Sequence, residues 1–75
     1  MISLDKVPLG KTCKVTKIST DSLLKQRLLD IGLVKGSVVK VFHQSPSGNP
    51  RAYIICGAII ALRNADASKI EVEEL

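Results

Sequence analysis

The segment 27–39 constrains the fold most, because it combines a helix end, two glycines and the start of a β-branched run. Gly32 suits the left-handed backbone position just past a helix, where a Cβ is disfavoured, and Leu33 then provides an apolar closing contact. Gly36 suits the positive φ of a turn that precedes a strand. This order predicts a short helix that is followed by a tight turn into a β-strand.

The predicted helix covers about residues 22–31. Thr20 or Asp21 can cap it, because either side chain can accept a hydrogen bond from a backbone N–H of the first turn. Arg27 falls within the apolar arc of the helix, where its stem can cover the core while its guanidinium reaches carbonyl groups of a neighbouring turn. Leu29 projects from the opposite side. The apolar arc itself consists of Leu23, Leu24, Leu28 and Ile31.

The rest of the chain predicts short, evenly spaced strands with no internal repeat. The strands are expected at 12–18, 38–44, 51–55, 58–63 and 69–73. The cluster 45–50 makes the second and third strands a hairpin, and residues 64–68 suit one turn of 3₁₀ helix. An open sheet of this size would expose its edges, which closure into a small barrel removes. We therefore expect a mainly β fold: a barrel of five or six strands with one inserted helix, in a single domain spanning 1–75.

Length and cysteine usage narrow the class of protein. A chain of 75 residues buries roughly 60% of its unfolded surface, so a deep substrate cleft is not expected. No signal peptide is visible at the N-terminus, and the apolar runs are far too short to cross a bilayer. These features favour a reduced, cytoplasmic protein without membrane insertion, in which Cys13 and Cys56 are small core residues. The oligomeric state is left open.

The residue types that carry catalysis are sparse. His43 is the single histidine, and the strand pattern places it on the face of Val39 and Val41 without a local acidic partner. Cys13, Cys56 and His43 lack the spacing that is typical of structural metal sites. We therefore expect no catalytic residue, no metal and no cofactor, and we predict that the chain is not an enzyme.

Binding to another macromolecule is the remaining class of function. The formal charge is +4, but the basic residues are dispersed, and two aromatic residues make a poor platform for stacking bases. Nucleic-acid binding is therefore the weaker alternative to protein contact. Leu29, joined to Val34 and the hairpin tip, can form an apolar docking patch with a basic rim. The candidate interface residues are Lys25, Leu29, Val34, Lys35, Pro46, Pro50 and Arg51.

The ordered set of motifs resembles the FeoA family, small cytoplasmic proteins of bacterial ferrous-iron transport. It is also similar to the C-terminal barrel domain of iron- and manganese-dependent repressors of the diphtheria-toxin-repressor type. The matching residues span essentially the whole chain: Leu9-Gly10, Val15, Ile18, Arg27-Leu28, Ile31-Gly32-Leu33, Gly36, Pro46, Gly48, Pro50, Ile60-Ala61-Leu62-Arg63, Ala67, Ile70 and Val72. Two positions depart from the family pattern: Lys35 stands where proline is frequent, and Ile31 where leucine is usual.

The resemblance implies an SH3-like β-barrel with an inserted helix, in which Arg27, Gly32, Gly36 and Arg63 are structural motif residues. It also implies a non-enzymatic accessory of the membrane permease FeoB, whose cytoplasmic GTPase domain is the expected partner. Recruitment to the inner face of the membrane would follow from that partner. Arg51 or Arg63 as an arginine finger acting on the GTPase is a further candidate, although a strand end favours a structural Arg63. A metal-responsive regulatory domain is a second alternative.

Overall fold

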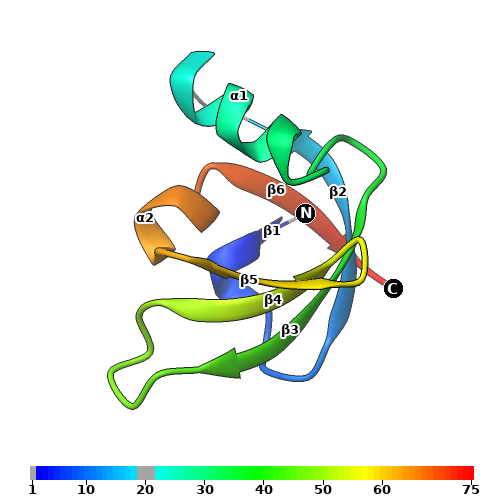
Figure 1. The fold of residues 1–75 in the computed structure, drawn as a ribbon. Coiled ribbons are helices and arrows are strands. Elements are labelled where there is room, and N and C mark those ends of the chain that lie inside the picture. Colours follow the sequence, from blue (N-terminus) through cyan, green and yellow to red (C-terminus); the bar gives the residue numbers. More distant parts are fainter. Residues whose placement is uncertain (1, 19–21) are drawn as a thin grey trace.

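The computed structural model describes residues 2–18 and 22–75 and folds them mainly into one antiparallel sheet (Figure 1). The predicted helix caps, Thr20 and Asp21, lie outside the described residues, as do the side chains of Leu23 and Leu24. The elements in chain order are β1 (Ile2–Ser3), the 3₁₀ helix η1 (Leu4–Lys6), β2 (Thr12–Ile18), α1 (Ser22–Asp30), β3 (Val38–Gln44), β4 (Arg51–Ile55), β5 (Ala58–Leu62), α2 (Asn64–Ala67) and β6 (Ile70–Glu74).

The six strands follow the order β1-β6-β2-β3-β4-β5, and every neighbouring pair is antiparallel. Within the described ranges, β1 and β5 are the outer strands and are not hydrogen-bonded neighbours. The five predicted strands are confirmed to within a residue at each end. The sequence missed β1 and η1, because segments of two or three residues are too short to show a period. It also predicted a 3₁₀ turn where α2 forms one α-helical turn.

The end of α1 follows the predicted glycine stop. Gly32 has a φ of +88°, and its N–H donates to the Leu29 carbonyl oxygen at 3.0 Å. The N–H of Leu33 donates to the Leu28 carbonyl oxygen at 2.9 Å, and Leu33 is buried. These two bonds form the Schellman arrangement, which satisfies carbonyl groups that a helix end leaves unpaired. The Ser37 hydroxyl then donates to the Gly32 carbonyl oxygen at 3.1 Å and holds the turn before β3.

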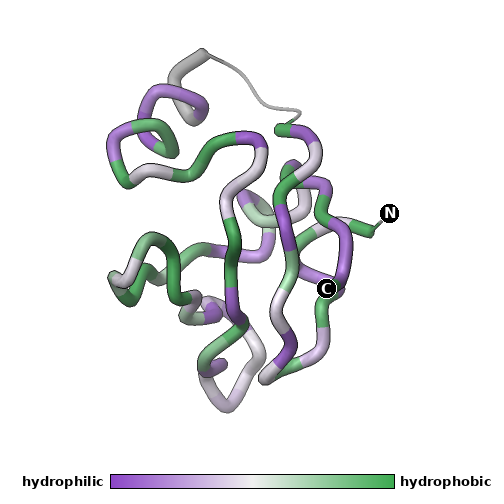
Figure 2. The backbone as a smooth tube through the Cα atoms, turned by 90° about the vertical axis from the view of Figure 1, so that its right-hand side faces the viewer, coloured by the Kyte–Doolittle hydropathy of each residue, from purple (hydrophilic) through white to green (hydrophobic). Residues whose placement is uncertain are grey.

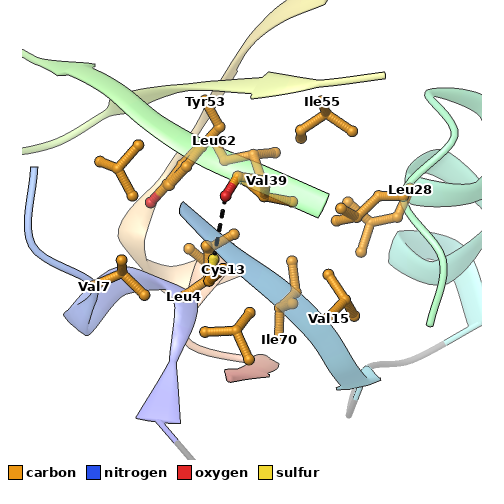
Figure 3. Close-up of a cluster of buried hydrophobic side chains, with 14 residues drawn as sticks. Leu4, Val7, Cys13, Val15, Leu28, Val39, Tyr53, Ile55, Leu62 and Ile70 are labelled. Atoms are coloured by element: carbon orange, nitrogen blue, oxygen red, sulfur yellow. Dashed lines mark hydrogen bonds between the residues drawn. The ribbon is translucent and has the colours of Figure 1, made fainter. Parts of the chain in front are cut away.

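The core is aliphatic and is built from alternate strand residues together with η1, α1 and α2 (Figure 3). Along the strands, hydrophobic and hydrophilic residues alternate in short runs (Figure 2). The Cys13 thiol donates to the Val39 carbonyl oxygen at 3.4 Å. Burial, reinforced by the negative charge of Glu74, raises the pKa of Cys13 to about 11. The buried apolar residues are Leu4, Val7, Cys13, Val15, Leu28, Leu33, Val39, Val41, Tyr53, Ile55, Leu62, Ala67, Ile70 and Val72.

Two residues lie where the sequence pattern does not place them. Cys56 is exposed instead of buried, because it forms the tight β4–β5 turn with Gly57, at φ values of +51° and +79°. His43 is exposed instead of sharing the inner face with Val39 and Val41. The β3–β4 register shifts between Val41 and His43, and such a bulge re-aims the side chains that follow it.

Arg51 is a buried charged residue, only 5% exposed. Its Nη1 donates to the Asp5 carbonyl oxygen at 2.6 Å, and its Nη2 donates to the Val7 carbonyl oxygen. Its guanidinium carbon also lies 5.7 Å from the centroid of the Tyr53 ring. Arg51 therefore ties β4 to the backbone of η1 and the residue after it. The sequence assigned this kind of contact to Arg27.

Candidate docking groove

A groove of about 440 Å³ lies between α1 and the C-terminal half of β2. We call it the α1 groove; it is lined by Thr16, Lys17, Ile18, Lys25, Leu29, Val34 and Lys35. Its apolar side chains are Ile18, Leu29 and Val34. Leu29 is 46% exposed and Val34 is 41% exposed, so both present aliphatic surface to solvent. Aliphatic surface gathered in a hollow is typical of a contact site.

The rim of the α1 groove is basic. Lys17, Lys25 and Lys35 line it and are exposed. Among the described residues that line it, none is acidic. Three ammonium groups around an apolar floor favour a partner surface that has carboxylates around an apolar side chain. The lysine stems can also lie along the aliphatic floor while their charges stay in water.

Two local features position the groove. On α1, Leu29 follows the buried Leu28 and is therefore turned about 100° away from the core, toward the open side. On β2, the pairing with β6 shifts between Val15 and Lys17. This irregularity interrupts the alternation of faces, so three consecutive residues, 16–18, line the same groove. The Thr16 hydroxyl donates to the Glu71 carbonyl oxygen at 3.1 Å and anchors this part of β2.

The structure brings together four of the predicted interface residues and separates the other three. Lys25, Leu29, Val34 and Lys35 all line the α1 groove. Pro46 and Pro50 are exposed, but they lie at the β3–β4 tip, at the opposite end of the molecule from α1 (Figures 1 and 2). Arg51 is buried, so it is not available to an exposed patch. The sequence pattern did not reveal that β2 contributes to the groove, because this contribution depends on how α1 packs over that strand.

Of the remaining motif residues, Arg27 and Arg63 lie outside the α1 groove and share a hollow with Asp66. Arg27 is exposed and lines a cavity of about 110 Å³ together with Asp66 and residues of β5. Gly36 adopts the predicted positive φ, at +95°. Arg63 is exposed and extended, and it occupies the N-cap position of α2. Of the two arginine-finger candidates, the structure therefore buries Arg51 and leaves Arg63 at the surface.

In ranges 2–18 and 22–75, no three His, Cys, Asp or Glu side chains are placed to hold a metal ion. None of the helices in the described part of the chain has the length and apolar content needed to cross a bilayer.

The FeoA domain family matches residues 2–74. This chain belongs to the FeoA family. A curated relative, the Fe(2+) transport protein A/Fe(2+) transporter FeoB fusion protein of Porphyromonas gingivalis, is 30% identical over 70 residues. The match covers 93% of this chain but only 8% of that relative. FeoA domains are thus associated with ferrous-iron transport, and this relative carries one fused to FeoB.

Solved structures confirm the fold that the resemblance implies. The FeoA protein of Chlorobium tepidum is 30% identical, with a TM-score of 0.93 over 99% of this chain and 70% of that one. The zinc complex of Stenotrophomonas maltophilia FeoA, described as a prokaryotic SH3 domain protein, is 25% identical. Its TM-score is 0.84, over 97% of this chain and 91% of that one. A manganese-dependent transcriptional repressor, 24% identical with a TM-score of 0.87, shares the fold over 97% of this chain and 41% of its own. The SH3-like fold is therefore confirmed.

Proposed function

We propose that this FeoA domain is a non-enzymatic accessory of ferrous-iron transport that binds the cytoplasmic GTPase domain of a FeoB-type permease through the α1 groove. The observation that carries the proposal is the apolar floor of the groove, rimmed by three lysines. The fused relative supports the choice of partner, because one chain there contains both FeoA and FeoB. Fusion keeps two modules at a high effective concentration, which favours direct contact between them. A cytoplasmic location follows from this partner.

Leu29 is the anchor of the proposed interface. About half of its side chain is exposed, and burying that half against a partner contributes on the order of 1 kcal/mol. The lysine rim acts mainly on the association rate, because charges around an interface steer the encounter. Binding should therefore weaken as salt is raised, in proportion to the carboxylates on the facing surface.

The test is the affinity of the chain for the purified FeoB GTPase domain of the same organism, measured by calorimetry with and without guanine nucleotide. The Leu29→Asp variant should bind at least about tenfold more weakly, because a carboxylate would be desolvated in an apolar contact. Leu9→Asp is the matched control, since Leu9 is also exposed but does not line the groove. Equal losses in the two variants, or none in Leu29→Asp, would contradict the proposed interface.

A further inference from the structure

The outer face of β3, β4 and β5 carries a second exposed apolar surface, which shares no residue with the α1 groove. Val38, Phe42 and Ile59 are 52%, 50% and 61% exposed. Ile54 on β4 pairs with Lys40 on one side and with Ile59 on the other. Val38 and Phe42 flank Lys40 along β3 and are thus diagonal neighbours of Ile54. We call this set, Val38, Lys40, Phe42, Ile54 and Ile59, the outer β face.

The β3 bulge enlarges this surface. His43 pairs with Ala52, whereas Val41 pairs with Tyr53, so Phe42 is the extra residue on β3. Phe42 and His43 are both exposed as a result. Tyr53 is buried, and the chain contains no other phenylalanine, tyrosine or tryptophan, so Phe42 is its one exposed residue of these three types. A half-exposed phenylalanine on a strand surface suggests a partner that buries its ring.

The charged side chains of β3, β4 and β5 are all of one sign. No Asp or Glu occurs anywhere in residues 31–65, which include β3, β4, β5 and their turns. Lys40 lies at the centre of the face, whereas Lys14 on β2 pairs with Val38 at its edge and with Glu73 of β6 on the other side. Both lysines are exposed. With Lys40 at its centre and no acidic residue on β3, β4 or β5, the outer β face fits a partner that is anionic at its boundary and apolar just beneath it.

A phospholipid bilayer has this layered chemistry, because anionic headgroups cover the acyl chains. We propose that the outer β face rests on an anionic membrane surface. Phe42, Val38 and Ile59 enter the interfacial layer, while Lys40 reaches a lipid phosphate. None of these side chains lines the α1 groove.

Two other occupants fit less well. A second copy of the chain, packed face to face about a two-fold axis, brings Lys40 toward its own counterpart, and like charges in a contact are unfavourable. A single-stranded nucleic acid would meet only the rings of Phe42 and His43 here, and the aliphatic side chains around them offer no further stacking surface for bases. Acyl chains, in contrast, bury aliphatic and aromatic side chains alike.

The test is sedimentation of the chain with vesicles of phosphatidylcholine mixed with phosphatidylglycerol, and with vesicles of phosphatidylcholine alone. We expect binding to the anionic vesicles only, weakening with salt. Because the chain has no tryptophan, Phe42→Trp provides a fluorescence probe whose emission should shift to the blue on binding.

Lys40→Glu should lower the vesicle partition coefficient at least about tenfold. Lys69→Glu, at an exposed residue outside the outer β face, is the charge-matched control. Circular dichroism melts confirm that each variant folds.

Several results would overturn the proposal. Absence of binding to anionic vesicles at low salt would do so, as would equal losses in Lys40→Glu and Lys69→Glu, since these would report net charge alone. A blue shift of Phe42→Trp with an oligonucleotide but not with vesicles would assign the face to nucleic acid. Dimers that Phe42→Asp dissociates, without vesicle binding, would assign it to a second copy of the chain.

Discussion

Replacing Arg51 with methionine should destabilise the domain more than any change at an exposed arginine. Methionine keeps much of the apolar stem but removes both donors, so the carbonyl oxygens of Asp5 and Val7 lose their charged partner. A hydrogen bond to a charged group contributes about 1.5–3 kcal/mol. Relief from burying a cation offsets part of the loss of two such bonds. We therefore expect the free energy of unfolding to fall by about 2–4 kcal/mol.

In a domain of this size, each kcal/mol shifts the melting temperature by roughly 4–8 °C, so Arg51→Met should melt roughly 10–30 °C lower. Thermal and urea unfolding followed by circular dichroism measure this directly. Arg51→Lys should fall between Arg51→Met and the parent chain, because one ammonium group does not reproduce the two-pronged guanidinium. Arg63→Met, at an exposed arginine, is the control and should change stability by less than about 0.5 kcal/mol. If Arg51→Met proved as stable as Arg63→Met, the contact between β4 and η1 would not support the fold.

Two further stability predictions follow from the structure. Gly32→Ala and Gly36→Ala both place a Cβ at positive φ, costing about 1–2 kcal/mol each, but only at Gly32 would that Cβ lie 3.1 Å from the Cys56 sulfur. Gly32→Ala should therefore be the less stable of the two in urea unfolding, and equal midpoints would refute the close approach. Burial raises the folded-state pKa of Cys13 from 9.0 to about 11, so the unfolded thiol loses its proton first as pH rises. The contribution of the protonated thiol to the free energy of unfolding is complete below pH 9. It is lost between pH 9 and 11, where it falls by up to about 2–3 kcal/mol. Burial also raises the pKa of Tyr53, so the loss of stability continues at higher pH. When the free energy of unfolding is measured against pH, Cys13→Ala should flatten the dependence between pH 9 and 11. An unchanged dependence in this variant would show that Cys13 does not cause it.

The sequence predicted those parts of the fold that depend on local backbone geometry. Gly32 and Gly36 mark positive φ angles, and the alternation in 38–44 and 51–55 marks a hairpin; each signal lies within a few residues of the structure that it specifies. The FeoA resemblance rested on the order of these signals along the chain. For that reason the fold could be predicted in advance, including the helix between β2 and β3.

The misplaced residues depend on contacts that are distant in sequence. Arg51 looks like any surface arginine until its partners, 46 and 44 positions earlier, are folded against it. His43 and residues 16–18 follow shifts in strand register, which depend on the pairing of two strands and not on the composition of one. The helix pattern thus revealed the α1 half of the groove, whereas the β2 half required the tertiary structure.

The most direct test of the proposed function is a map of backbone amide shifts in the ¹⁵N-labelled chain as the FeoB GTPase domain is added. We predict that the largest changes fall on the residues that line the α1 groove: Thr16, Lys17, Ile18, Lys25, Leu29, Val34 and Lys35. The β3–β4 tip around Pro46 and Pro50 should change little. Changes centred on that tip, or no change at saturating concentrations of the GTPase domain, would contradict the proposal that the groove is the docking site.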